Sequence, residues 1–256
     1  MKVTVLGCGS SQGVPMIGGR WGDCDPGNPR NRRRRPSIFV EWDGVNILVD
    51  TAPDLRDQAI DAGIERVDAV LFTHAHADHV HGIDDLRGIA REMGRDIAVY
   101  AEAAVLDEIV SRFSYLFRGA SGPARNYPPF LRPIVIEGPF EVRDRPVVPF
   151  EQDHGICPST GFRFAGLAYS TDVVRIPEAS FDRLAGVDTW IVDCLRLDRA
   201  HPTHAHWPVT RGWLDRIAPR RAILTHMNHH ADYAAMQAAT PDAVEPAHDG
   251  MRLETP

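Results

Sequence analysis

The stretch Leu71-Phe72-Thr73-His74-Ala75-His76-Ala77-Asp78-His79 decides how this sequence is interpreted. Its first residues have the composition of a buried strand, and they lead directly into three imidazoles and one carboxylate. Residues two apart in an extended segment share a face, so His74 and His76 can bind one ion together. Asp78 and His79 follow where the chain turns into a helix, and they can face a second ion. The spacing therefore predicts two neighbouring metal half-sites.

The ligand types in this stretch indicate a catalytic metal site. Imidazole and carboxylate bind zinc, manganese or iron, and sites without thiolate generally serve catalysis. Histidines at strand ends are often ordinary surface or core residues, but this combination and spacing favour metal binding. The motif His-x-His-x-Asp-His is that of the metallo-β-lactamase superfamily, which the chain resembles here. The resemblance implies an α/β fold, the four-layer αββα sandwich, which we expect as a single domain over residues 1–256.

Three later residues complete the ligand set of that superfamily. Each of His154, Asp172 and His226 directly follows a strand-like run. Taken alone, each would more often be a structural polar residue, but their order and placement favour ligands. The resemblance implies two divalent ions, zinc or manganese, held by His74, His76 and His154 on one side and by Asp78, His79 and His226 on the other, with Asp172 as the bridge.

Asp50 ends the apolar run Val45 to Val49 and matches the first acidic position of the superfamily. A carboxylate there is expected to orient a ligand imidazole. The alternative is a simple helix cap before Pro53. The sequence leaves both interpretations open.

The opening stretch Leu6 to Pro15 resembles the phosphodiesterase branch of the superfamily, which includes the phosphoribosyl cyclic phosphate phosphodiesterases and, more distantly, ribonuclease Z. That branch has a general-acid histidine in the region where this chain has His201, His204 and His206. Imidazole suits this role because it titrates near neutral pH. We expect His204 to be the acid, with His206 as the reserve candidate and His201 as a surface residue.

One feature of the branch is incomplete in this chain. The cyclic phosphodiesterases hold a structural zinc with a cysteine cluster in the N-terminal loop and a later histidine. Here only Cys24 stands in that loop, while His229 occupies the histidine position. A remnant site of Asp23, Cys24 and His229 is one interpretation, and we favour hydrogen bonding within the loop.

Composition restricts the partners of the protein. The net charge of -7 argues against wrapping of a long nucleic acid, and the run Arg32 to Arg35 is better explained as a solvated or salt-bridged loop.

No apolar run approaches the roughly 18 residues of a membrane span, and Met1 leads into a strand-like segment without a signal peptide. The four cysteines form no Cys-x-x-Cys pair. We expect a cytoplasmic protein with a small anionic phosphodiester or nucleotide-like substrate, and a homodimer is compatible with the sequence.

Strand-like and helical patterns alternate along the chain. Strands are expected at residues 3–6, 38–42, 45–49, 69–72, 97–100, 134–136, 147–150, 161–164, 167–170, 189–194 and 222–225. Helices are expected at residues 53–62, 84–92, 103–117, 177–184, 206–217 and 231–239. The segments Gly7 to Pro36 and Arg118 to Pro133 are expected to be long loops near the site, because loops of that length are usually functional.

These observations favour a metal-dependent phosphodiesterase that acts on small cyclic or nucleotide-like substrates. A hydroxide between two metal ions would attack phosphorus, Asp78 would act as a ligand in the reaction centre, and His204 would protonate the leaving oxygen. Two alternatives stay open. One is a thioester or lactone hydrolase on the same dinuclear site, and the other is a nonenzymatic metal- and nucleotide-binding protein.

Overall fold

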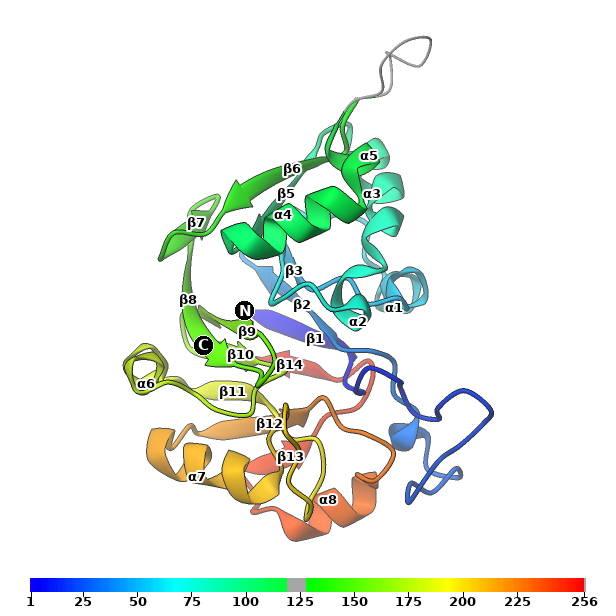
Figure 1. The fold of residues 1–256 in the computed structure, drawn as a ribbon, viewed down its shortest axis with the longest axis vertical. Coiled ribbons are helices and arrows are strands. Elements are labelled where there is room, and N and C mark those ends of the chain that lie inside the picture. The colour runs from blue at the N-terminus through cyan, green and yellow to red at the C-terminus, as the bar shows by residue number, and fades with distance from the viewer. Residues whose placement is uncertain (119–127, 256) are drawn as a thin grey trace.

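A computed structural model of the protein describes residues 1–118 and 128–255. Two seven-stranded sheets face each other, and helices cover the outer face of each sheet (Figure 1). Helices α1 to α5 cover the first sheet, while α6 to α8 cover the second. The four-layer αββα sandwich predicted from the sequence is confirmed.

Each sheet is mixed, with parallel strands in one half, which includes an edge strand, and antiparallel strands in the other. The first sheet has the order β14 (Arg252–Glu254), β1 (Lys2–Gly7), β2 (Ser37–Trp42), β3 (Val45–Val49), β4 (Ala69–Leu71), β5 (Ile97–Ala101) and β6 (Leu131–Val135). The second sheet has the order β13 (Val244–Pro246), β12 (Arg221–Thr225), β11 (Thr189–Asp193), β10 (Leu167–Ser170), β9 (Pro158–Phe164), β8 (Arg145–Asp153) and β7 (Phe140–Val142).

The helices lie mainly in the connections between strands. The first layer contains α1 (Leu55–Ala62), α2 (Ala77–Val80), α3 (Leu86–Met93), α4 (Ala103–Arg112) and α5 (Ser114–Phe117). The second layer contains α6 (Glu178–Leu184), α7 (Trp207–Ile217) and α8 (Tyr233–Ala239). Two 3-10 turns, η1 (Pro29–Asn31) and η2 (Ile83–Asp85), complete the set. No helix of the described ranges is both long and apolar enough to cross a bilayer.

Strand β3 shows why the sequences of the interior strands are continuously apolar. Ile47 and Val49 pack in the core between the two sheets, while Leu48 points to the core under the first helical layer. Successive side chains of a strand point to opposite faces, and here both faces are buried. The apolar run therefore places this strand in the middle of a layered fold.

Most predicted elements are confirmed, and the differences have physical reasons. The helix expected at residues 103–117 divides at Phe113, and the edge strands β7, β13 and β14 were not predicted because three residues are too short to show a period. The loop expected at Arg118 to Pro133 is wrong at its end, where β6 begins. Pro133 suggested a loop, yet β6 is an edge strand, where proline is tolerated. Residues 119–127 of this predicted loop lie outside the described residues.

The N-terminal loop between β1 and β2 is held by its arginines. Arg33 is buried, and its guanidinium donates to the side-chain oxygen of Asn31 (3.2 Å) and the carbonyl of Asn228 (3.4 Å), and contacts the sulfur of Cys24 (3.8 Å). The next two arginines form salt bridges with Asp61 and Asp54. The salt-bridged loop favoured for this arginine run is confirmed.

The buried guanidinium gives a stability prediction. Arg33→Ala leaves several buried acceptors without their donor, so we expect the free energy of unfolding to fall by about 2–3 kcal/mol. Urea denaturation measures this change. The matched control is Arg32→Ala at an exposed position, where we expect a change within about 0.5 kcal/mol. Equal stability of the two variants would contradict the role assigned to Arg33.

Candidate metal centre

The candidate site lies where strands of both sheets end. His74 and His76 follow β4, whereas His154, Asp172 and His226 follow β8, β10 and β12 of the opposite sheet. Strands β10, β11 and β12 are parallel, so their carboxyl ends meet at one edge. Such edges are the usual position of ligand sites in α/β folds.

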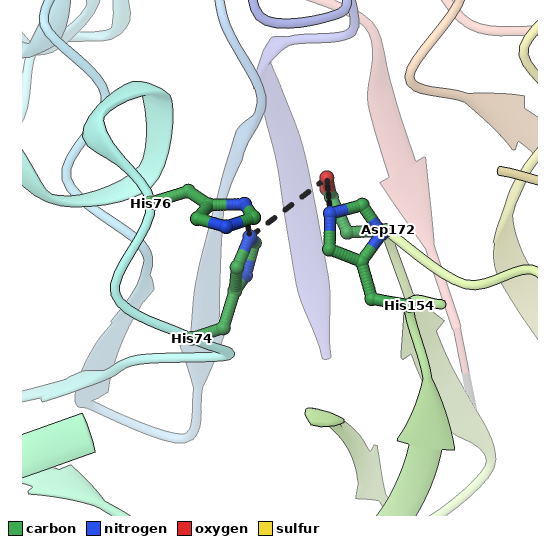
Figure 2. A group of neighbouring side chains, drawn as sticks. All are labelled: His74, His76, His154 and Asp172. Carbon is green, nitrogen blue, oxygen red and sulfur yellow. Dashed lines mark hydrogen bonds and ion pairs between the residues drawn. The ribbon is translucent and has the colours of Figure 1, made fainter. Parts of the chain in front are cut away.

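The first group of ligand atoms comes from both sheets. One atom each of His74, His76, His154 and Asp172 lies within 4.8 Å of the others. Figure 2 shows His74 and His76 on one side of the gap, facing His154 and Asp172 on the other. Asp172 Oδ1 is 3.8 Å from His74 Nε2 and 3.5 Å from His154 Nε2. Residues that are far apart in the sequence thus converge on one carboxylate oxygen.

The second group uses the other oxygen of the same carboxylate. Ligand atoms of His79, Asp172 and His226 lie within 4.8 Å of one another. His79 Nε2 is 2.9 Å from Asp172 Oδ2, and Asp78 Oδ2 is 3.4 Å from the same nitrogen. Asp78 thus lies next to the second group, although its carboxylate is farther from His79 Nε2 than that of Asp172. The structure brings together all seven residues that the sequence proposed as ligands.

The donors have the properties that a divalent cation requires. His79 Nε2 and His226 Nε2 are buried and have no hydrogen-bond partner. His79 Nε2 lies close to Asp172 Oδ2, but the orientation of the two groups is not that of a hydrogen bond. Buried polar atoms are rarely left unpaired, and nitrogen and oxygen atoms that converge without bonding each other fit a shared cation.

Burial and mutual charge set the protonation of the cluster. Burial lowers the pKa of His226 to about 3 and holds that of His74 well below its usual value. Burial opposes ionisation of Asp172, but the imidazoles of His226 and His79 hold its pKa well below the usual range. The directions for His226, His74 and Asp172 match the neutral imidazole and ionised carboxylate that bind metals. The pKa of His79 moves the other way: burial lowers it, but the carboxylates of Asp172, Asp78 and Asp50 raise it well above its usual value.

Asp50 fixes the orientation of one imidazole in the second group. It is fully buried, and its carboxylate accepts hydrogen bonds from His79 Nδ1 (2.7 Å) and from the backbone NH and hydroxyl of Thr73 (both 2.9 Å). These bonds direct Nε2 of His79 towards Asp172. The helix-cap alternative for Asp50 is wrong, because the N-cap residue of α1 is Asp54.

Three residues of the site share an uncommon backbone conformation. Asp50, Asp172 and His226 have positive φ angles of 62°, 52° and 58°. Non-glycine residues adopt this left-handed region infrequently, and such positions concentrate at functional sites. In each case the turn directly after a strand points the side chain into the site, so local backbone strain helps to fix the cluster before any ligand binds.

His204 lies at the rim of the same cluster. Its ring stacks on that of His226 with centroids 4.6 Å apart, and its Nδ1 is 3.1 Å from Asp193 Oδ2. Burial by itself lowers the pKa of His204, but the Asp193 carboxylate raises it above the ordinary value, while burial raises the pKa of Asp193 to about 6. His206 instead forms the N-cap of α7, and His201 Nδ1 bonds the Thr203 hydroxyl (3.1 Å).

Sequence reasoning missed two residues beside the site. Asp193 is the last residue of β11, and the strand-end position that drew attention to Asp172 could have revealed it. Cys157 has its sulfur 3.9 Å from His76 Nε2. No motif marks this cysteine, because only the pairing of β8 with β9 brings it to the site.

The remnant zinc site of the N-terminal loop does not form. Asp23 is paired with His230 (2.6 Å), and the sulfur of Cys24 lies near the carbonyl of Asn228 (4.0 Å). Among the described residues, Asp23, Cys24 and His229 do not form a group at metal-binding distances. Hydrogen bonding is observed, as favoured from the sequence, but it joins Asp23 and Cys24 to the segment after β12 as well as to Arg33 within the loop.

The chain has the αββα fold, with a buried cluster of histidines and aspartates at the strand ends that could hold metal ions. The chain belongs to the β-lactamase superfamily, because the family model described as "Beta-lactamase superfamily domain" matches residues 45–227. The family predicted from the sequence motif is confirmed.

Individual relatives place the chain in the phosphodiesterase branch. The crystal structure of a diphosphatase from the PhnP family is 32% identical, with a TM-score of 0.89, over 100% of this chain and 98% of that chain. Ribonuclease Z of Methanopyrus kandleri is 37% identical over 79 residues, which are 30% of this chain and 28% of that protein. An octanoyltransferase of Porphyromonas gingivalis is 36% identical over 90% of this chain, but the match covers only 46% of that protein. The chain thus spans less than half the length of these two curated relatives.

The hydrogen bond between Asp50 and His79 gives a prediction about metal affinity. Asp50→Asn weakens the support of the imidazole, and we expect metal affinity to fall by about tenfold to a hundredfold. Competition with a chromogenic chelator measures it. Asp57→Asn, on the exposed face of α1, is the control and should retain the wild-type affinity. Unchanged affinity in Asp50→Asn would refute the orienting role.

Proposed function

We propose that the protein is a phosphodiesterase that cleaves small cyclic or nucleotide-like phosphodiesters with two divalent ions, zinc or manganese. The observation that carries this proposal is Asp172, whose two carboxylate oxygens belong to two adjacent groups of ligand atoms. The similarity to a PhnP-family diphosphatase and to ribonuclease Z supports phosphoesters as the substrate class. Membership of the superfamily supports hydrolysis as the reaction.

The residues divide between the two ions as follows. One ion would be held by His74, His76 and His154, the other by Asp78, His79 and His226, and both by Asp172. When bound, the pair of ions supplies a Lewis acid that makes water a nucleophile near neutral pH and neutralises the phosphate oxygens. The protein contributes the fixed geometry, because Asp50 and the strained strand ends hold the ligands in place.

His204 is the proposed general acid. Its Nδ1 faces Asp193 and lies 3.9 Å from Asp172 Oδ1, so its ring stands at the edge of the metal cluster. Asp193 holds the ring in one orientation and supports its protonated form. The proton would pass from the imidazole to the departing alkoxide, which leaves as an alcohol. His206, at the N-terminus of α7, stays the reserve candidate.

A thioester or lactone hydrolase is the second candidate function. The observation that favours it is the octanoyltransferase of Porphyromonas gingivalis, whose name indicates acyl transfer. The match covers less than half of that protein, so its activity need not belong to the shared segment. A nonenzymatic metal- and nucleotide-binding protein would instead bind nucleoside monophosphates without cleaving phosphodiesters, thioesters or lactones.

The general-acid proposal predicts the effect of one substitution. His204→Ala should lower kcat on adenosine 2′,3′-cyclic monophosphate, whose leaving group is an alkoxide, by about a hundredfold to ten-thousandfold without changing metal content. The controls are His201→Ala and His206→Ala, which should retain most of the activity. If His206→Ala loses the activity and His204→Ala keeps it, the acid is the reserve candidate. Parallel assays with thioesters and lactones test the scissile bond.

The shared carboxylate predicts the metal stoichiometry. Wild-type protein should contain about two equivalents of divalent metal, and Asp172→Ala should lose both, because each ion loses a ligand. Elemental analysis after gel filtration measures the content, and chelation of the wild type should abolish hydrolysis. His206→Ala should keep both ions. Retention of two equivalents by Asp172→Ala would exclude the bridging role.

A further inference from the structure

Cys157 brings a sulfur atom of the second sheet to a histidine of the first. It lies in the turn between β8 and β9, whereas His76 follows β4. The Cys157 sulfur is 3.9 Å from His76 Nε2, and Figure 2 shows the His76 ring beside His74 and across from His154. Cys157 is half-buried, while the other three cysteines are buried. The contact therefore crosses the gap between the two sheets at the first group of ligand atoms.

The two ring nitrogens of His76 have different surroundings. Nδ1 lies 2.9 Å from His74 Nε2, which is itself 3.8 Å from Asp172 Oδ1. Nδ1 thus belongs with the ligand atoms, and Nε2 is the nitrogen that faces Cys157. When one nitrogen of a neutral imidazole binds a metal ion, the other carries the hydrogen. The sulfur of Cys157 is in position to accept that hydrogen.

Other imidazoles of the cluster show the same arrangement with oxygen as the acceptor. The nitrogen turned away from the ligand group contacts one oxygen atom in each of three cases: Thr73 Oγ1 for His74 (2.9 Å), Asp50 Oδ2 for His79 (2.7 Å) and the Thr203 carbonyl for His154 (2.8 Å). Such partners fix the orientation of a ligand histidine. Cys157 occupies the equivalent position for His76.

The turn that carries Cys157 has little conformational freedom. The backbone NH of His154 donates to the carbonyl of Cys157 (3.0 Å). Gly155 has a φ of 84°, and a Cβ on this residue would clash with the carbonyl oxygen of Pro202. The sulfur is therefore held in a fixed place beside His154, which is itself a member of the first group.

We propose that Cys157 is a positioning residue of the metal centre, whose sulfur accepts the Nε2 hydrogen of His76 and keeps Nδ1 directed at the first group. This inference rests on the metal binding in the proposed function, and it gives Cys157 no contact with the ion. Sulfur is a weak acceptor, so His76 is held less firmly than His79, which has a carboxylate partner. The affinity for one of the two ions thus depends on a thiol.

Two substitutions of the same residue separate hydrogen bonding from packing. Cys157→Ala should lower the zinc affinity of one of the two ions by about tenfold, the lower end of the range for such partners. Cys157→Ser should recover most of the loss, because a hydroxyl also accepts a hydrogen bond. Competition of the full chain with a chromogenic chelator measures both. The control is Ile156→Ala in the same turn, where the side chain is 71% exposed, and it should keep the wild-type affinity.

Spectroscopy supplies a readout that packing alone would not change. In nitrogen-15 NMR of the zinc-loaded protein, the Nε2 hydrogen of His76 should exchange slowly with water in wild type and in Cys157→Ser, and rapidly in Cys157→Ala. The cobalt(II)-substituted wild type should lack the intense near-ultraviolet band of a cobalt–thiolate bond, because the sulfur faces Nε2 and not the ion.

The outcomes separate this inference from the proposed function. Equal metal affinity of wild type and Cys157→Ala overturns the positioning role, even if phosphodiesters are cleaved. An equal loss in Ile156→Ala also overturns it, and so does a cobalt–thiolate band that disappears in Cys157→Ser, since Cys157 would then be a ligand. Wild type that binds no divalent ion overturns both proposals. A loss in Cys157→Ala that serine restores, in a protein that cleaves no phosphodiester, supports the positioning role and refutes the proposed reaction.

Discussion

The carboxylate of Asp172 is the constraint on which the site depends. It is almost fully buried, and the imidazoles of His74, His79, His154 and His226 approach its two oxygens from both sheets. A buried charge is costly unless it is paired. The arrangement is therefore stable only when the two sheets pack in one register, which links the hydrophobic core between them to the chemistry at its edge.

The supports around this carboxylate are themselves buried and rigid. Asp50 has its oxygens occupied by Thr73 and His79, and the hydroxyl of Thr171 donates to Asp172 Oδ2 (2.8 Å). The left-handed backbone at three strand ends adds strain that the packed sheets maintain. A site held in this way needs little reorganisation when a ligand binds, which is how fixed charges become effective in catalysis.

The surroundings of the site are electrostatically unequal. Arg196 and several histidines line a cavity of about 250 Å³ on the side of the N-terminal loop. Three glutamates, Glu102, Glu137 and Glu151, line another cavity, of about 550 Å³, near the start of α4. The burial of Arg33 contributes to this asymmetry indirectly, since it fixes the loop that carries Ser10 and Ser11. The overall negative charge of the chain therefore says little about the local field at the site.

The sequence by itself determined the layered fold and the ligand types. The apolar runs around Val45 and Ala69 indicate buried strands, and the spacing from His74 to His79 indicates two metal half-sites. Both patterns depend on local geometry, which the sequence encodes directly. Only the tertiary structure decided which distant groups meet. The partnership of His204 with Asp193 and the position of Cys157 beside His76 depend on how separate strand ends pack together. No local period encodes such contacts, since they arise from the register of two sheets joined through a common core.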